Sequence, residues 1–308
     1  MAKLPAVRGR FAPSPTGPLH FGSLVAALGS FLEARCRGGE WLVRIEDVDR
    51  PRTVPGAADA ILRILERCGL GWDGPVVYQS QRTDAYQAAL DRLLNRGLAY
   101  PCTCTRRELA TQPRASDGSP IYPGHCRSGV RNPDRPHAIR LRVDDAPLTF
   151  HDAIQGDYRQ CLETEVGDFV IRRANGLFAY QLAVVVDDAA QGITQVVRGS
   201  DLLDSTPRQL YVQRLLGVAA PEYAHLPIVV DRHGDKLSKQ TGAKPLDEND
   251  PGPALWNALR FLGQSPLLEL ADAPAAEIIA WALAHWRLAN VPAVPRFPID
   301  MAQLDLFW

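Results

Sequence analysis

A turn near the start of the chain combines residue types that could bind a phosphate. Residues 10–24 read RFAPSPTGPLHFGSL, in which a short apolar run enters a proline-rich turn that ends in His20 and Gly22. A long apolar helix pattern begins at Leu24. Free N–H groups and the dipole at a helix N-terminus favour an anion, and glycine lets a phosphate approach the backbone. An ordinary strand-to-helix turn is the alternative interpretation.

Lysines are rare in the chain, and most of them lie in one short stretch. Arginine supplies thirty of the 34 cationic side chains, and three of the four lysines, Lys236, Lys239 and Lys244, occur within nine residues. The stretch around them reads DRHGDKLSKQTGAK. Lysine is a compact point charge on a flexible stem, which suits a phosphate-binding loop. The lysine cluster makes a phosphate-binding role for the turn at residues 10–24 more favourable than the interpretation as an ordinary strand-to-helix turn.

A second set of charged residues could hold a small zwitterion that carries an additional carboxylate. Arg10, Glu46 and Arg198 lie at the ends of predicted strands, and Ser14 lies in the turn beside the first of them. Guanidinium groups pair well with carboxylates, and a carboxylate can face an ammonium group. Ligands of open α/β sheets bind at the carboxyl ends of strands. Taken singly, each of these residues is more typical of a surface ion pair, and only their shared position at strand ends favours a ligand site.

Three cysteines lie in a segment with too few apolar residues to form its own core. Cys102 and Cys104 are separated by one residue, and Cys126 follows after 21 more. Thiolates with a fourth donor form structural zinc sites that stabilise such loops. Candidate fourth donors nearby are His125, Tyr122 and His137. Three buried thiols without a metal are the alternative, whereas a disulfide is not expected in the cytosol.

The elements that must position these residues alternate between strand and helix. Apolar residues at helical spacing predict helices, and continuous or alternating apolar runs predict strands. Helices are expected from residue 24 and over residues 56–69, 83–97, 205–216, 251–262 and 275–286. Apolar runs of strand length occur at residues 7–11, 41–45, 138–143, 169–171, 178–186, 195–198 and 223–230. This alternation predicts an α/β fold with a doubly wound parallel sheet.

Residues 100–137 interrupt the alternation, because they carry many prolines and glycines and little apolar periodicity. We therefore predict an α/β domain whose parallel sheet is split by an insertion. Residues 1–99 form its first half, residues 100–187 form the insertion with the zinc site, and residues 188–245 form the second half with the lysine loop. Residues 246–308 are expected to form a short helical region that ends in an irregular tail from residue 290.

Composition and charge exclude some classes of protein. The chain is 46% hydrophobic, and none of its apolar runs approaches the roughly 20 residues of a membrane span. Its first residues lack an apolar secretion signal, so we expect a cytoplasmic protein without a membrane partner. The net charge is −1, but residues 100–143 carry a net +5 and residues 246–308 a net −5. A basic middle segment is compatible with a nucleic-acid backbone, or with an arginine-rich solvated loop.

Several motifs in this order resemble those of class I aminoacyl-tRNA synthetases. RFAPSPTG followed by LHFG resembles their HIGH signature, and KLSKQ at residues 236–240 resembles their KMSKS loop. Ser23 and Gln240 stand where the two signatures end in His and Ser. RIEDVD at residues 44–49, FAYQLAVVVDD at 178–188 and VVRGSDLL at 196–203 resemble the glutamyl subgroup. The resemblance covers residues 8–245 and implies a Rossmann-type parallel sheet of the class I kind.

The end of the chain narrows the resemblance. Only 68 residues follow Gln240, where a glutamyl-tRNA synthetase has a stem-contact region and a large anticodon-binding domain. We therefore expect residues 246–308 to be a short stem-contact-like region without an anticodon-binding domain. That shortness and the Cys-x-Cys…Tyr-x-x-x-Cys insertion resemble the glutamyl-Q tRNA(Asp) synthetase family. This family resemblance implies one structural Zn²⁺ bound by Cys102, Cys104, Cys126 and Tyr122.

The family resemblance also implies an activity. ATP with Mg²⁺ would activate L-glutamate to glutamyl-adenylate without tRNA, and the glutamyl group would pass to queuosine in the anticodon of tRNA(Asp). His20, Lys236 and Lys239 would be catalytic and would bind ATP together with Gly22. The residues implied to bind glutamate are Arg10, Ser14, Glu46, Tyr180 and Arg198. The protein is expected to be a monomer. A minimal glutamyl-tRNA synthetase that charges the tRNA 3′ end and a non-catalytic RNA- or amino-acid-binding module are the alternatives.

Overall fold

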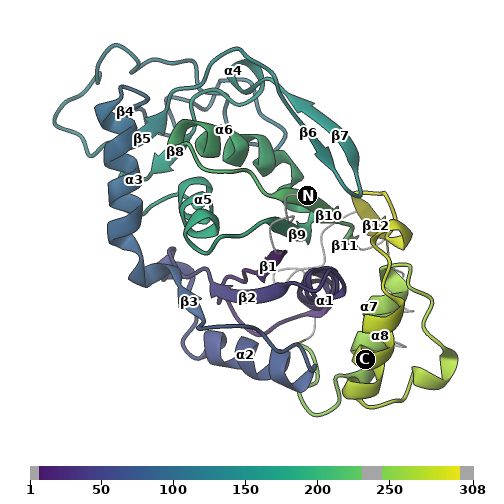
Figure 1. Cartoon of the computed structure of the whole chain (residues 1–308). Helices are drawn as coiled ribbons and strands as arrows, with labels where there is room; N and C mark the ends of the chain where they lie inside the picture. The colour runs from purple at the N-terminus through teal and green to yellow at the C-terminus, as the bar shows by residue number, and fades with distance from the viewer. Residues whose placement is uncertain (1–6, 231–244, 299–308) are drawn as a thin grey trace, which may run out of the picture.

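The computed structural model describes residues 7–230 and 245–298, and its centre is a parallel sheet in two halves (Figure 1). The first half has the order β1 (Arg8–Phe11), β2 (Glu40–Ile45) and β3 (Val77–Tyr78). The second half pairs β9 (Gln195–Gly199) with β10 (Glu222–Leu226), also in parallel. The N–H of Thr194 donates to the carbonyl of Arg8 at 3.0 Å and joins the halves. The predicted α/β fold with a parallel sheet is confirmed.

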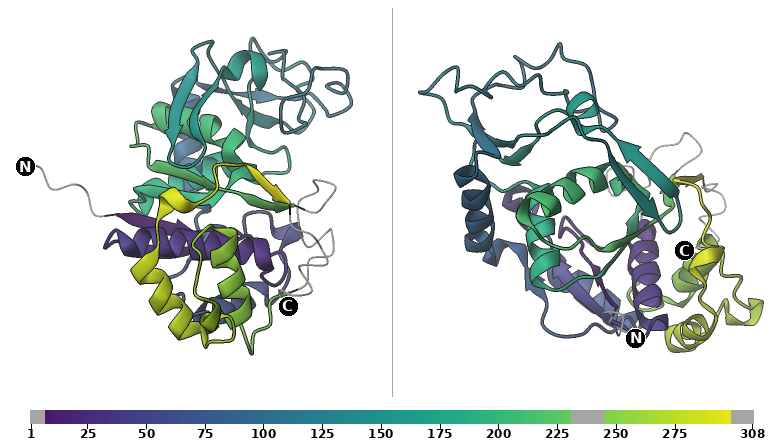
Figure 2. Two further views of the ribbon diagram at one scale, coloured as in Figure 1. Left: turned by 90° about the vertical axis from the view of Figure 1, so that its right-hand side faces the viewer. Right: turned by 45° about the horizontal axis from the view of Figure 1, so that its top comes forward.

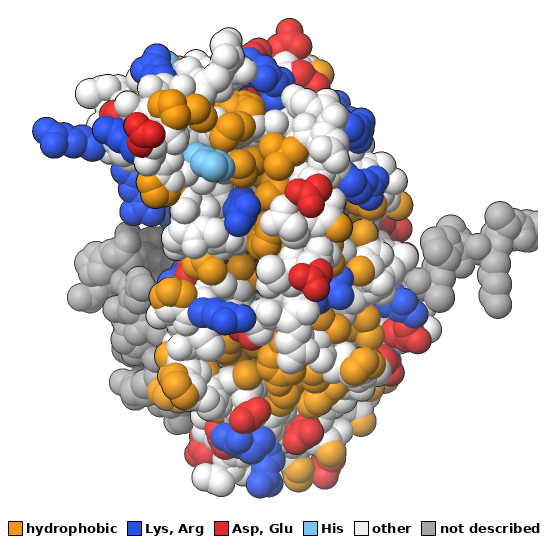
Figure 3. Space-filling model, turned by 90° about the vertical axis from the view of Figure 1, so that its left-hand side faces the viewer, with side chains coloured by type: hydrophobic (Ala, Val, Ile, Leu, Met, Phe, Trp, Pro, Cys, Tyr) orange, Lys and Arg blue, Asp and Glu red, His pale blue; other side chains and the backbone are white. Residues whose placement is uncertain are grey.

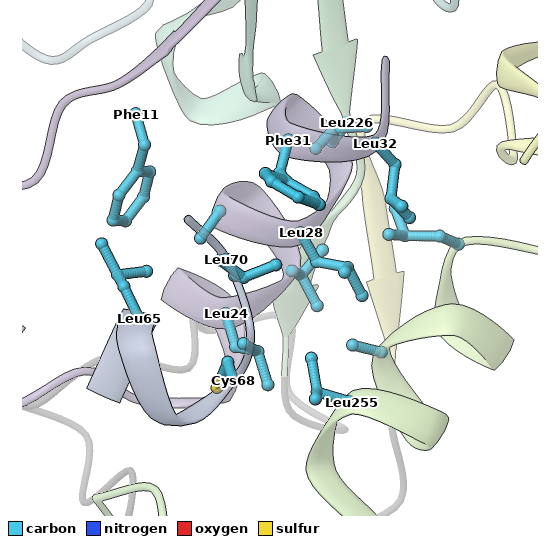
Figure 4. Packing of buried hydrophobic residues seen from close by; sticks show 14 of the residues in the cluster. Phe11, Leu24, Leu28, Phe31, Leu32, Leu65, Cys68, Leu70, Leu226 and Leu255 are labelled. Carbon is cyan, nitrogen blue, oxygen red and sulfur yellow. The ribbon is translucent and has the colours of Figure 1, made fainter. Parts of the chain in front are cut away.

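Helix α1 (Phe21–Cys36) fills the centre of the first core and is buried over most of its surface. Its Leu24, Leu28 and Leu32 point toward Leu226 of β10 and Leu255 of α7 (Figure 4). Helices α2 (Ala57–Arg67), α7 (Gly252–Phe261) and α8 (Ala275–His285) surround it. A helix that is apolar nearly all round must be packed on all sides, which places its N-terminus at a fixed depth within the protein.

A second core holds the insertion against the second half of the sheet. It combines α3 (Thr83–Asn95), α5 (Tyr180–Ala190) and α6 (Thr206–Leu216) with an antiparallel sheet. That sheet has the order β4 (Ala99–Cys102), β5 (Ala138–Leu141) and β8 (Val170–Arg172). The insertion lies at one end of the molecule and the C-terminal helices at the other (Figure 2).

A hairpin of the insertion extends the central sheet. Strands β6 (Leu148–Asp152) and β7 (Gly156–Gln160) are antiparallel to each other, and β6 pairs in parallel with β10 at Asp152 and Tyr223. The resulting order is β7-β6-β10-β9. The insertion therefore contributes strands to the half-sheet that contains β9, and the predicted ligand site lies where β9 ends.

Several elements differ from the sequence-based expectations. The apolar run at residues 178–186 forms helix α5, because its residues pack between α3 and α6 instead of joining a sheet. Residues 223–230 form two strands, β10 and β11 (Ile228–Val230), on either side of Pro227. The tail is not wholly irregular, since β12 (Arg296–Pro298) pairs with β11. The β6–β7 hairpin had no predicted counterpart.

The remaining elements are short. They are helix α4 (Leu162–Glu165) and the 3-10 turns η1 (Arg50–Arg52), η2 (Gln79–Gln81), η3 (Ser200–Ser205), η5 (Leu268–Leu270) and η6 (Leu288–Asn290). Within residues 7–230 and 245–298, none of the helices combines the length and the apolar character needed to cross a bilayer. The division at residues 99, 187 and 245 stays a prediction.

Candidate active site

A cavity of about 730 Å³ opens where strands β1, β2 and β9 end. Seven of the nine residues predicted for ATP and glutamate line it: Arg10, Ser14, His20, Gly22, Glu46, Tyr180 and Arg198. They come from both halves of the sheet, from the first turn and from α5. The other two, Lys236 and Lys239, lie outside the described residues.

One side of the cavity is the N-terminus of α1. His20 is the N-cap of this helix, Gly22 lies in its first turn, and that turn contains no acidic residue. The described residues on either side of the lysine stretch reach the same place. Val229 lines the cavity before the stretch, and after it Pro245 forms a β-bridge with His20. This side therefore has the positive helix end that favours a phosphate.

Beneath the opposite side lies a buried network of charges. Arg10 donates to both carboxylate oxygens of Asp188, at 3.2 and 3.4 Å, and Arg44 lies 2.8 Å from the same carboxylate. Arg44 is completely buried, and Asp188 is nearly so. Asp187, the neighbouring residue of α5, accepts hydrogen bonds from Gln79, Arg82 and Tyr86. Asp188 of α5 thus fixes Arg10, the arginine that faces the cavity.

Glu46 is a carboxylate of the cavity whose ionisation is opposed by its buried environment. Burial raises the pKa of Glu46 to about 7, although Arg44 and Arg10 act in the opposite direction. Arg44 lies 3.5 Å from one of its oxygens. A carboxylate with a pKa near neutrality can bind a cationic group when it is ionised and loses that ability when it is protonated.

Arg198 is held by a set of acceptors on its far side. Its Nε donates to Nε2 of His225 at 3.0 Å, and its Nη2 donates to Oγ1 of Thr206 at 2.8 Å. Its Nη1 lies 3.4 Å from the hydroxyl of Tyr180, which also lines the cavity. Burial lowers the pKa of His225 to about 4, so this imidazole is neutral. Arg198 and Tyr180 therefore present a cationic and a hydroxyl donor together.

Some residues of the site were not identified from the sequence. Arg44 and Asp188 lie at the ends of the motifs at 44–49 and 178–188, but nothing in their spacing shows that they meet. His225 is a single histidine in an apolar strand, a pattern that gives no functional signal.

The three cysteines of the insertion form a cluster with the dimensions of a tetrahedral metal site. The sulfur atoms of Cys102, Cys104 and Cys126 lie within 4.8 Å of one another. The hydroxyl of Tyr122 lies 3.3 Å from Cys102 Sγ and 3.5 Å from Cys104 Sγ. A zinc tetrahedron with bonds of about 2.3 Å to sulfur and 2.0 Å to oxygen has S···S and S···O edges of roughly 3.8 and 3.5 Å.

Tyr122 fits the fourth position better than the histidines do. Among the described residues, neither His125 nor His137 joins the cluster. Arg140 donates to Cys102 Sγ at 3.3 Å and lies over the Tyr122 ring at 3.8 Å. A cation beside these groups stabilises thiolate and phenolate, the forms that bind metal. This cluster could therefore hold a zinc ion.

The first part of the insertion, residues 100–143, is also the basic part of the chain. Arginine side chains are spread over the upper part of one face, which the insertion forms (Figure 3). Some of these arginines have structural roles, such as Arg127, which donates to both oxygens of the buried Asp168 at 2.7 Å. Others, including Arg106 and Arg131, lie in its irregular loops.

Residues 6–279 match the family described as tRNA synthetases class I (E and Q), catalytic domain. The chain belongs to this family. As a class I synthetase it is a ligase with a glutamyl-tRNA synthetase-like activity, and this class uses ATP with Mg²⁺. The resemblance seen in the two signature motifs is thereby confirmed.

Similar curated proteins share a name that is more specific than the description of the family. A protein of Thiobacillus denitrificans named glutamyl-Q tRNA(Asp) synthetase is 58% identical over 93% of this synthetase and 95% of its own length. A protein of Dechloromonas aromatica with the same name is 59% identical over 92% of this chain and 95% of its own. In each comparison the similarity thus covers nearly the whole length of both proteins, including the insertion.

Solved structures show the same fold in a longer enzyme. The glutamate-tRNA synthetase of Elizabethkingia anophelis is 27% identical and superposes with a TM-score of 0.79. The match covers 98% of this synthetase and 70% of that chain. A glutamate tRNA ligase of Elizabethkingia meningosepticum, solved in complex with its amino acid, gives a TM-score of 0.78 at 27% identity.

Proposed function

We propose that this synthetase activates L-glutamate with ATP in the absence of tRNA and transfers the glutamyl group to queuosine in the anticodon of tRNA(Asp). The observation that carries the first step is the cavity that combines Arg10, Glu46 and Arg198 with the N-terminus of α1. The cavity offers two cationic side chains and one anionic side chain for glutamate, and a helix N-terminus for the phosphates of ATP. The names of the similar proteins support the choice of acceptor.

In the first step a glutamate carboxylate attacks the α-phosphorus of ATP. The new C–O–P linkage forms as the bond to pyrophosphate breaks, and pyrophosphate leaves with its electron pair. Donors that are already oriented stabilise the charge on the phosphates. His20, the N-terminus of α1, Lys236 and Lys239 supply these donors, and Mg²⁺ bound to ATP neutralises phosphate charge. The attacking carboxylate is ionised at neutral pH, so no general base is required.

The amino acid is held on the other side of the cavity. Arg10 and Arg198 face the two carboxylates of glutamate, and Glu46 faces its ammonium group. The Tyr180 hydroxyl and Ser14 complete the contacts. In the second step a hydroxyl of the queuosine cyclopentene ring attacks the glutamyl carbonyl, and AMP leaves as the ester forms, its phosphate taking up the hydroxyl proton. The basic first part of the insertion, residues 100–143, is the surface that contacts the RNA.

Queuosine can be tested as the glutamyl acceptor by removing the alternative acceptor, the 3′-terminal adenosine of the tRNA. We expect tRNA(Asp) that contains queuosine to take up labelled glutamate and to retain the label after the 3′-terminal adenosine is removed. Queuosine-free tRNA(Asp) is the matched control and should remain unlabelled. Loss of the label with the terminal adenosine would instead identify a minimal glutamyl-tRNA synthetase.

The activation step has its own test. Glutamate-dependent exchange of pyrophosphate into ATP should proceed without any tRNA.

Glu46 gives this reaction an expected pH dependence. Because burial raises the pKa of Glu46 to about 7, the carboxylate is protonated below that pH and cannot pair with the ammonium group. We expect kcat/KM for glutamate in pyrophosphate exchange to fall about tenfold per pH unit below neutrality, since kcat/KM reports the free enzyme. The Glu46→Gln variant should lack this limb and retain only the titration of ATP. A flat profile between pH 8 and pH 6 in the unaltered enzyme would contradict the assignment.

We also propose that the cysteine cluster holds one structural zinc ion. Cys102, Cys104, Cys126 and Tyr122 would be its ligands, and its role would be to stabilise loops that have little core of their own. We expect one zinc per chain, its loss in the Cys126→Ala variant, and a lower midpoint of thermal unfolding in that variant. Cys36→Ala is the control, because Cys36 is exposed and lies on α1. Full zinc content in Cys126→Ala would refute the ligand set.

A further inference from the structure

Three buried side chains form a line from the insertion to the cavity. Asp152 ends strand β6 of the hairpin, His225 lies on β10 and Arg198 lies on β9, which are neighbours in that order in the sheet. Asp152 Oδ2 lies 2.6 Å from His225 Nδ1, and Arg198 Nε lies 3.0 Å from His225 Nε2. Asp152 and His225 are fully buried, and Arg198 is 6% exposed. Only the last of the three lines the cavity.

The hydrogen-bonding capacity of the end groups determines the protonation of the imidazole. A guanidinium group has only donors, so His225 Nε2 must present a lone pair to Arg198. The Nδ1 atom therefore carries the proton and donates it to Asp152. The other oxygen of Asp152 accepts the backbone N–H groups of Ile154, Gln155 and His225 at 2.9–3.0 Å. Asp152 is thus an acceptor at both oxygens, which requires its ionised form.

The hairpin holds residue 225 at further points. The Gln155 side chain donates to the carbonyl of His225 at 2.8 Å, and the N–H of Ala153 donates to the carbonyl of Tyr223 at 2.9 Å. These bonds fix the imidazole in position and orientation relative to the insertion.

Arg198 has one end committed to the protein and one end directed to the cavity. His225 accepts from Nε, and Thr206 Oγ1 and the Leu202 carbonyl accept from Nη2. Nη1 remains, beside the Tyr180 hydroxyl. A guanidinium held along its Nε and Nη2 side cannot rotate without losing these bonds, so its Nη1 donor is oriented before a ligand binds.

We propose that Asp152 and His225 are positioning residues for amino-acid recognition. By holding His225 in the Nδ1–H tautomer, Asp152 keeps a lone pair toward Arg198 and directs its Nη1 at a substrate carboxylate. The insertion hairpin, which supplies Asp152, is therefore part of the amino-acid site. This inference rests on the proposed function, because it takes glutamate to be the ligand of Arg198.

Asp152→Asn tests this tautomer requirement with nearly unchanged volume. The asparagine carbonyl is needed for the three backbone N–H donors, so its amide nitrogen faces His225 Nδ1. That contact forces the proton onto Nε2, where it opposes the Arg198 N–H. We expect KM for glutamate to rise at least tenfold in pyrophosphate exchange, with KM for ATP changed less than twofold. Equal effects on both KM values would show a general structural role and overturn the proposal.

His225→Gln separates the acceptor for Arg198 from simple packing. The glutamine Oε1 can take the place of Nε2 as acceptor for Arg198 while its NH2 group faces Asp152, whereas leucine at this position offers Arg198 no acceptor. We expect His225→Leu to raise KM for glutamate at least tenfold and His225→Gln to raise it less than threefold. Equal rises in the two variants would also overturn the proposal.

A spectroscopic measurement distinguishes failure of this inference from failure of the proposed function. The ¹⁵N shifts of histidine-labelled protein should show His225 protonated on Nδ1 in the unaltered enzyme and on Nε2 in Asp152→Asn. The His225→Gln spectrum assigns the signal among the seven histidines. Absence of the switch would overturn the tautomer mechanism, whereas absence of glutamate-dependent exchange in the unaltered enzyme would overturn the proposed function and leave the spectra unaffected.

Discussion

Replacing Asp188 with alanine should lower the free energy of unfolding by about 3–5 kcal/mol, the usual cost of removing one partner from a buried ion pair. Asp188 pairs with Arg10 and with the fully buried Arg44. Without it, two guanidinium groups lose a carboxylate in a place that water does not reach. Glutamate-dependent pyrophosphate exchange should be lost as well, because Arg10 is no longer held at the cavity. Urea denaturation and the exchange assay measure the two effects.

Two further variants serve as controls for this result. Asp188→Asn keeps the shape of the side chain and should fold more stably than Asp188→Ala, since its carbonyl still accepts one hydrogen bond. Asp157→Ala removes an aspartate whose side chain is 93% exposed and whose ion-pair partner within residues 7–230 and 245–298 is the exposed His151. That change should alter stability by less than about 0.5 kcal/mol, as exposed pairs contribute little. A similar small loss in Asp188→Ala would mean that the buried network does not anchor the site.

Lys239→Ala should lower the rate of pyrophosphate exchange on the order of 10²–10³-fold, which is typical for loss of one donor to transition-state charge. Lys239 lies outside the described residues, so this expectation comes from the KLSKQ motif and the family match. The structure adds that Val229, before the stretch, lines the cavity, and that Pro245, after it, forms a β-bridge with the cavity residue His20. Zinc content should not change.

Lys3→Ala is the matched control, because Lys3 is the one lysine outside residues 236–244. It should retain full exchange activity. Lys239→Arg should recover only part of the rate, since guanidinium and ammonium groups differ in shape and hydration. Normal exchange in Lys239→Ala would remove this residue from the reaction.

Local features of the sequence were sufficient for much of the architecture. Helices α2 and α3 follow from apolar spacing and glycine stops, α7 and α8 were also predicted from the sequence, and β1, β2 and β9 follow from short apolar runs. The residues expected to bind glutamate could be chosen because they sit in recognisable motifs at strand ends. The structure brings all five of them to one cavity.

Other features depended on contacts between distant parts of the chain. The run at 178–186 contains three successive valines, which favour a strand locally, yet it is helical because α3 and α6 enclose it. The pairing of Tyr223 with Asp152 and of β11 with β12 involves strands that are far apart in sequence. No local pattern encodes such pairings.

The sequence by itself determined the family, the α/β class and the chemical types of the candidate ligand-binding residues, because these depend on short motifs and on local periodicity. The tertiary structure decided which buried groups hold those residues. Asp188 meets Arg10 across 178 positions and Asp152 meets His225 across 73. The physical reason is that burial and hydrogen-bond partners, which set the orientation of Arg198 and the pKa of Glu46, exist only once separate elements pack together.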